Sequence, residues 1–165
     1  MANVVIKVKP ANLDMTGTVF MIYANRYRTA AVGWLSTSKR EFGFDPVPYY
    51  LLCQSLELHL KSFIWLEDRV GTKTIKSKYG HNLEKLRTHA KTRRVDRYAR
   101  ATGLRNRVIS LVAPYYRRRQ FNYLDLDMVF DGYNNLKSEP KVIPTLRRLT
   151  HQLGKSLRQP ILKAS

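Results

Sequence analysis

Apolar residues recur at three- and four-residue intervals along most of the chain, which is the spacing of one face of an α-helix. The first such segment begins near Asn12 or Asp14, both good helix caps, and runs to about Ser36. Its apolar positions form a single stripe, which consists of Leu13, Phe20, Tyr23, Tyr27, Ala31 and Trp34. This pattern predicts an amphipathic helix that packs one side against the rest of the protein.

A second segment, from about Pro48 to Asp68, is apolar on almost every side. Only narrow polar strips interrupt its leucines and aromatic residues. A helix that is hydrophobic all round is a buried one. We therefore expect residues 48–68 to form the central helix of the fold.

Three further helical segments follow, and they span about residues 81–101, 104–116 and 144–160, where Pro160 is expected to end the last one. Residues 76–80 are expected to form a loop, residues 117–141 a loop with a short helix, and Val4–Lys9 a short extended segment. Strands do not alternate with helices anywhere, and no internal repeat is evident. The sequence therefore predicts one all-α domain over residues 1–165, an up-and-down bundle of about four to five helices.

Length and composition narrow the class of protein. A chain of 165 residues, of which 44% are hydrophobic, can bury a core of its own. Cys53 is the single cysteine, which excludes an internal disulfide framework, and its apolar neighbours predict a small buried side chain. No apolar run approaches the ~18 residues of a membrane span, and the N-terminus lacks the apolar region of a signal peptide. We therefore expect a cytoplasmic protein without a membrane contact.

Charge is the feature that departs most from an ordinary domain. There are 30 Lys and Arg residues against 12 Asp and Glu, which gives a net charge of +18. More than half of the excess lies in residues 73–107, which hold 12 basic and 2 acidic residues. Such an excess opposes compaction through self-repulsion and suggests a polyanionic partner. A cationic surface that serves only solubility is the alternative.

The predicted helix over residues 81–101 would carry many of these charges as a basic ridge. We expect Arg93, Arg97 and Arg100 to share one helical face. The whole ridge, over residues 85–107, comprises Lys85, Arg87, Lys91, Arg93, Arg94, Arg97, Arg100, Arg105 and Arg107, and a second patch comprises Arg117, Arg118 and Arg119. Such a ridge can follow the phosphates of RNA, with Tyr79 or Tyr98 available to stack on an unpaired base. A solvated helix face without a partner is the alternative. Neither patch resembles a base-reading module.

Gln54, Glu57 and Lys61 form a polar strip on the otherwise apolar central segment. Glu57 and Lys61 are four residues apart with the acid first, which is the favoured order for an ion pair on a helix. Because an unpaired buried charge is severely penalised, we expect both side chains to be largely buried and paired, directly or through a shared polar partner. The pair either sets the packing register or faces a ligand.

Other chemistry has little support in the sequence. No two of the four histidines have the four-residue helical spacing of a metal site, and no carboxylate completes a set. His59 is expected to be a satisfied structural imidazole and not a catalyst. Nucleophile elbows and phosphate-cradling glycine loops are absent. The sequence thus predicts no catalytic residue, no metal and no cofactor.

Two stretches of the chain resemble a known family. They are Ser55-Leu56-Glu57-Leu58-His59-Leu60-Lys61 and Lys78-Tyr79-Gly80-His81-Asn82-Leu83-Glu84-Lys85-Leu86. In the HEPN superfamily (higher eukaryote and prokaryote nucleotide-binding domains), a Glu-x-x-x-Lys pair on a central helix precedes a Gly-His-Asp-Leu-like helix start. Glu57 and Lys61 match the pair, while Gly80 and His81 match the helix start, with Asn82 in place of the aspartate. The resemblance covers about residues 52–90.

The resemblance implies a bundle of four or five helices, often dimeric, that works near RNA or nucleotides, as in toxin–antitoxin and phage-defence systems. Ribonuclease members of the family carry Arg, then four to six arbitrary residues, then His. No histidine of this chain has an arginine at that distance, and the nearest case is Lys76 before His81. A non-catalytic member of the family is therefore the better interpretation.

Three functions remain open on these grounds. The first is a non-catalytic protein that binds RNA or another polyanion through the basic ridge. The second is a divergent ribonuclease in which His81 with Lys76, or His59 with an arginine from elsewhere, would act as acid and base. The third is an interaction or structural protein whose cationic surface meets an acidic partner protein.

Overall fold

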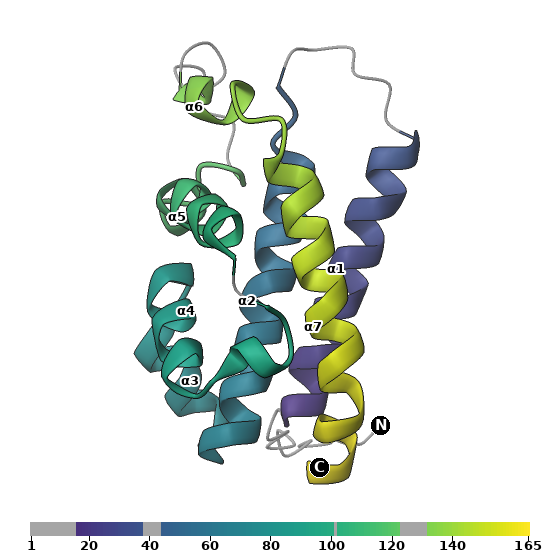
Figure 1. The fold of residues 1–165 in the computed structure, drawn as a ribbon, viewed down its shortest axis with the longest axis vertical. Helices are drawn as coiled ribbons and strands as arrows, with labels where there is room; N and C mark the ends of the chain where they lie inside the picture. Colours follow the sequence, from purple (N-terminus) through teal and green to yellow (C-terminus); the bar gives the residue numbers. More distant parts are fainter. Residues whose placement is uncertain (1–15, 38–43, 101, 123–131) are drawn as a thin grey trace, which may run out of the picture.

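The computed structural model describes residues 16–37, 44–100, 102–122 and 132–165, and every regular element in these ranges is helical (Figure 1). The helices are α1 (Gly17–Thr37), α2 (Val47–Asp68), α3 (Thr72–Tyr79), α4 (Leu83–Thr92), the 3₁₀ helix η1 (Val95–Arg97), α5 (Gly103–Arg117), α6 (Asn134–Lys137) and α7 (Val142–Ala164). The all-α prediction is confirmed. The short helix α6 lies in the stretch where a short helix was expected, whereas α3 adds to the predicted helices. The expected extended segment Val4–Lys9 lies outside the described residues.

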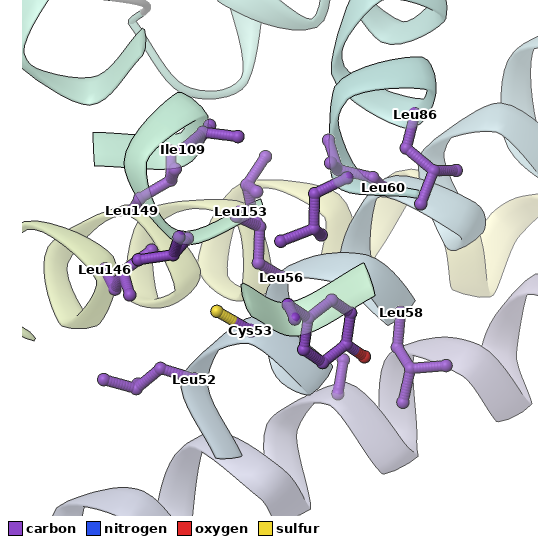
Figure 2. Packing of buried hydrophobic residues seen from close by; sticks show 14 of the residues in the cluster. Leu52, Cys53, Leu56, Leu58, Leu60, Leu86, Ile109, Leu146, Leu149 and Leu153 are labelled. Carbon is purple, nitrogen blue, oxygen red and sulfur yellow. The ribbon is translucent and has the colours of Figure 1, made fainter. Parts of the chain in front are cut away.

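The three long helices, α1, α2 and α7, pack side by side, while α4 and α5 cover another side of α2 (Figure 1). Figure 2 shows leucines of α2 meeting Leu86 of α4, Ile109 of α5 and Leu153 of α7. Each fully buried side chain of this size contributes about 1.5–3 kcal/mol relative to an exposed one. The core therefore lies around α2, which contacts helices from both halves of the chain.

The expectation that the second helical segment is central is confirmed. From Leu52 to Ile64, every residue of α2 except Gln54 is buried. The buried set includes three side chains that titrate or carry charge, namely Glu57, His59 and Lys61. A helix enclosed on this many sides has to satisfy its polar groups internally, because water cannot reach them.

The first helix buries only part of the expected stripe. Phe20 and Ala31 are buried as expected and Tyr27 packs against the core, whereas Tyr23 and Trp34 remain 47% and 43% exposed. Including Tyr23 and Trp34 in the buried stripe was therefore wrong, and Leu13 lies outside the described residues.

Residues 76–80, expected as a loop, belong mostly to helix α3. Ile75 and Tyr79, four residues apart, are both buried and hold this short helix on the core. Gly80 then ends it with a φ of +51°, a left-handed conformation that glycine adopts without strain. His81 follows immediately and is placed by this turn.

The predicted helix over residues 81–101 is interrupted. The α-helix ends at Thr92, and Arg94 has a φ of +57°, which turns the chain into η1. The ion pair of Arg93 with Asp68, 2.7 Å apart, lies at this break. The expectation that Arg93, Arg97 and Arg100 share one helical face was therefore wrong.

The last helix continues through Pro160, where the sequence predicted its end. Proline removes one backbone donor from the helix, but buried contacts on the following turn compensate. Ile161 is fully buried, and the carbonyl oxygen of Ala164 accepts a hydrogen bond from Arg69 Nη1 at 3.1 Å. These two contacts hold the final turn against α2.

Gly154 marks the closest approach of α7 to its neighbours, and it yields a first prediction. A Cβ at this position would lie 2.5 Å from Asn25 Oδ1 and 3.0 Å from His59 Nε2, whereas a Cβ on Gly33 of α1 meets nothing within 4 Å among the described residues. We expect Gly154→Ala to lower the free energy of unfolding by about 1–3 kcal/mol. Gly33→Ala is expected to raise it by about 0.5–1 kcal/mol. Urea unfolding measures both changes. If both variants are more stable than the parent protein, the close packing at Gly154 is contradicted.

Candidate functional site

Glu57 is the centre of a buried polar cluster. Its side chain is 1% exposed, and its Oε1 lies 2.6 Å from Lys61 Nζ. Its Oε2 accepts a hydrogen bond from the Tyr116 hydroxyl at 2.7 Å and lies 3.0 Å from His81 Nδ1. The Tyr116 hydroxyl also contacts Gln54 Oε1. The expectation of a buried, directly paired Glu57 and Lys61 is therefore confirmed.

Three segments of the chain supply this cluster. α2 carries the polar strip on one side, because Gln54, Glu57 and Lys61 recur at three- and four-residue intervals. The turn at Gly80 presents His81, and the last part of α5 presents Tyr116. The structure thus brings together the polar strip and the helix-start residues that the sequence singled out separately.

The electrostatics of the cluster keep Tyr116 neutral. Burial, and then the negative charge of Glu57, raise the pKa of the Tyr116 hydroxyl far above its usual range. The group therefore acts as a hydrogen-bond donor to the carboxylate. With Glu57 accepting at Nδ1, the other ring nitrogen of His81, Nε2, is left to face outward. The His81 side chain is 47% exposed, so this nitrogen can meet a ligand.

A cleft of about 820 Å³ opens beside this cluster. One wall comes from α1, with Val19, Phe20, Tyr23 and Tyr27. The opposite wall comes from α2, α3 and the turn that follows, and it consists of Gln54, Glu57, Leu58, Lys61, Lys76, Gly80 and His81. Glu57 and Lys61 therefore pair internally and also line a cleft.

The basic ridge is partly neutralised by acidic neighbours. Arg87 pairs with Glu84, Arg93 with Asp68 and Arg97 with Glu67, at 2.5 to 2.7 Å. Arg97 also lies over the ring of Tyr98. Exposed ridge residues for which the described part of the chain shows no ion pair are Lys85, Lys91, Arg94 and Arg100.

A set of cations that are distant in sequence converges across the break after α4. Arg87, Lys91 and Arg105 line one small cavity with Leu56 and Leu60 of α2. Burial, and then the positive charge of Arg148 on α7, lower the pKa of Arg105. Arg87, Lys91, Arg105 and Arg148 are called the cationic surface below. Sequence patterns link Arg87 to Lys91 but cannot relate Arg148 to Arg105, because that electrostatic interaction depends on how α5 packs on α7.

The second basic patch lies elsewhere. Arg117 and Arg118 line another cavity, of about 530 Å³, together with Asn82 and Glu84. Arg119 follows with a φ of +59° and is exposed. Glu84 lies between this cavity and Arg87, so negative charge separates the patch from the cationic surface.

His59 and Cys53 lie inside the bundle and take no part in the cleft. His59 is fully buried, its Nδ1 lies 3.4 Å from Ser55 Oγ, and its Nε2 has no hydrogen-bond partner among the described residues. Cys53 is also fully buried, and burial raises the pKa of its thiol, which makes it an unreactive core residue. Their placement agrees with the structural roles expected from the sequence, although half of the His59 imidazole lacks a partner.

Metal ligands do not gather in the described ranges, where no three His, Cys, Asp or Glu side chains lie close enough to hold an ion. None of the helices there is long and apolar enough to cross a membrane. Comparison with known proteins adds no further information, since no family model, curated protein or solved structure matches this chain.

Proposed function

We propose that the protein binds RNA or a similar polyanion through the cationic surface. The observation that carries the proposal is the cavity that Arg87, Lys91 and Arg105 line from α4 and α5, with the positive charge of Arg148 on α7 acting on Arg105. Like charges gathered in this way repel one another, and a bound anion relieves that repulsion. Phosphate groups supply such anions at regular spacing along a nucleic acid.

The position of the surface supports a backbone-tracking mode of binding. Its cations come from α4, α5 and α7, and the exposed Arg100 lies next to it, since its carbonyl oxygen accepts a hydrogen bond from Arg105 Nη1. Among the described residues, no helix projects from this surface with side chains that are free to read bases. Contacts to phosphate would therefore dominate. Affinity would then depend strongly on salt and weakly on sequence.

The second prediction concerns this salt dependence. Filter binding of a labelled RNA duplex is expected to weaken as salt rises, by ~0.9 log unit per log unit of salt for each phosphate contacted. Replacing Arg105 and Arg148 with glutamine should lower that slope by roughly 1.8, because two contacts are lost. A slope near zero for the parent protein would contradict polyanion binding.

A charge-matched variant controls for the loss of net charge. Lys73 and Lys163 are exposed residues of α3 and α7, and Lys163 lies 15 residues after Arg148, roughly 22 Å along the helix axis. Replacing these two lysines with glutamine should leave most of the slope unchanged. Equal slopes for the two double variants would show that binding is diffuse and does not use the cationic surface.

The same experiment addresses the ribonuclease and the acidic-partner hypotheses. His81 and Lys76 both line the cleft beside Glu57, which is the observation that favours hydrolysis. Cleavage of the labelled RNA that disappears in His81→Ala would support a ribonuclease. A protein partner that stays bound at high salt, with no RNA retained at low salt, would support the interaction hypothesis instead.

A further inference from the structure

We propose that the cleft between α1 and α3 binds a small organic anion with a flat or apolar body, at a site separate from the cationic surface. The two sites lie on different faces of α2. Leu56 and Leu60 face the cationic surface, whereas Glu57, Leu58 and Lys61 face the cleft. The cleft can therefore bind its ligand whether or not a polyanion occupies the other face.

Lys61 is the first reason to expect an anion. Its side chain is 5% exposed, yet it lines the cleft, so its ammonium lies at the base of the cavity. An ammonium has three donors, and the structure shows one of them bonded, to Glu57 at 2.6 Å. A buried cation with donors to spare favours an acceptor-rich, negatively charged group beside it.

His81 lies beside the same carboxylate and provides a second donor in its protonated form, in which both ring nitrogens carry a proton. Its Nδ1 lies 3.0 Å from Glu57 Oε2, which orients the ring, and the side chain is 47% exposed. Lys76 lines the cleft as well. The lining therefore holds more basic side chains than the single carboxylate of Glu57 can balance.

Glu57 does not reverse this preference. It is the only carboxylate among the described residues that line the cleft, and both of its oxygens already accept from Lys61, His81 and Tyr116. A ligand cation would have to displace one of these internal partners. An anion adds to the cluster without disrupting it.

The α1 wall determines the rest of the ligand. Val19, Phe20 and Tyr27 present an apolar surface, and Tyr23 leaves 47% of its surface exposed at the same wall. An aromatic ring beside an open cleft is suited to stacking on a flat group. The volume of about 820 Å³ lies in the range of small-molecule sites and is far larger than a single phosphate or carboxylate requires.

The third prediction uses two fluorescent probes that share a body and differ in charge. Anilinonaphthalene sulfonate carries an anionic group, and N-phenylnaphthylamine is its uncharged relative. The parent protein should bind the sulfonate about tenfold more tightly than the neutral probe, as expected for one charge-assisted hydrogen bond. Equal affinities for the two probes would contradict an anion site. Competition by benzoate and by phenyl phosphate then distinguishes a carboxylate from a phosphate ligand.

Three variants test the location of the site. His81→Gln should weaken the sulfonate about tenfold and leave the neutral probe unchanged, whereas Tyr23→Ala should weaken both probes. Lys73→Gln removes an exposed cation outside the cleft and should change neither affinity. His81 and Tyr23 are both partly exposed, so these variants are expected to fold. Unchanged sulfonate binding in both would place the probe elsewhere and overturn the proposal.

The double replacement of Arg105 and Arg148 by glutamine separates this inference from the proposed function. It should lower the salt slope of RNA binding and leave binding of the sulfonate unchanged. Loss of sulfonate binding in that variant would show that the probe occupies the cationic surface, which would also overturn the cleft site. Failure of RNA binding alone would leave the cleft proposal standing.

Discussion

Lys61→Met is expected to lower the free energy of unfolding by about 3–5 kcal/mol. Glu57 and Lys61 are 1% and 4% exposed, and their charges lie 2.6 Å apart inside the bundle. Removing the ammonium leaves a buried carboxylate that has only His81 and Tyr116 as donors. Denaturant unfolding of the parent and the variant measures the loss.

Two comparisons make this test specific. Adding Glu57→Gln to Lys61→Met should recover part of the lost stability, because no uncompensated charge then remains in the core. Arg107→Met, which breaks the exposed pair with Glu139 between α5 and the segment before α7, should cost only about 0–1 kcal/mol. Equal losses for Lys61→Met and Arg107→Met would show that Glu57 and Lys61 are hydrated.

Acidification from pH 6.5 to pH 4 is expected to lower the stability of the protein by about 3 kcal/mol through His59 alone. Burial, together with the positive charge of Arg28, lowers the pKa of His59 from its usual 6.5 to about 4, against an opposing hydrogen bond to the backbone of Ser55. Between these values the unfolded chain holds a proton on His59 and the folded protein does not. Unfolding therefore takes up a proton, and lower pH favours it.

His59→Leu isolates this contribution from the other titrating groups. The leucine carries no proton, and it also removes an Nε2 atom that lacks a hydrogen-bond partner among the described residues. Unfolding free energies measured from pH 7 to pH 4 should fall less steeply for His59→Leu than for the parent. Protonation of the other groups affects the parent and His59→Leu equally. Parallel curves would therefore mean that His59 is accessible to water.

The central helix and its ion pair could be predicted from the sequence because both depend on local spacing. An all-round apolar segment is buried wherever it lies in a bundle, and a four-residue Glu–Lys spacing places the two side chains together on any α-helix. Gly80 and His81 were singled out through the family resemblance. The contact of His81 with Glu57 spans 24 residues, and no periodicity in the sequence predicts it.

Tyr116 is the member of the cluster that the sequence analysis missed. It falls in an apolar helical pattern, where it looks like one more core aromatic residue. The available signal was chemical: a buried tyrosine hydroxyl needs a partner, and the polar strip on α2 needs donors. A buried tyrosine donor and the Glu57 acceptor are complementary, which makes a tyrosine of this helix a candidate partner of Glu57.

The break after Thr92 was missed for a different reason. Helix ends are usually recognised from glycine, asparagine or proline, and residues 92–95 contain none of them. The turn is instead accompanied by tertiary contacts, because Asp68 at the end of α2 pairs with both His89 and Arg93. Burial of Val95 and Ala99 then holds η1 on the core. Such tertiary contacts cannot be predicted from the residues at the break alone.

The segment between α2 and α7 carries most of the candidate functional side chains, whereas α1, α2 and α7 form the framework of the fold. α1, α2 and α7 form a three-helix frame, and residues 69–141 leave it and return before α7 begins. That excursion supplies His81, Tyr116 and most of the cationic surface. Substitutions at its exposed positions can therefore change what the protein recognises, while the buried residues of the same segment keep it packed on α2.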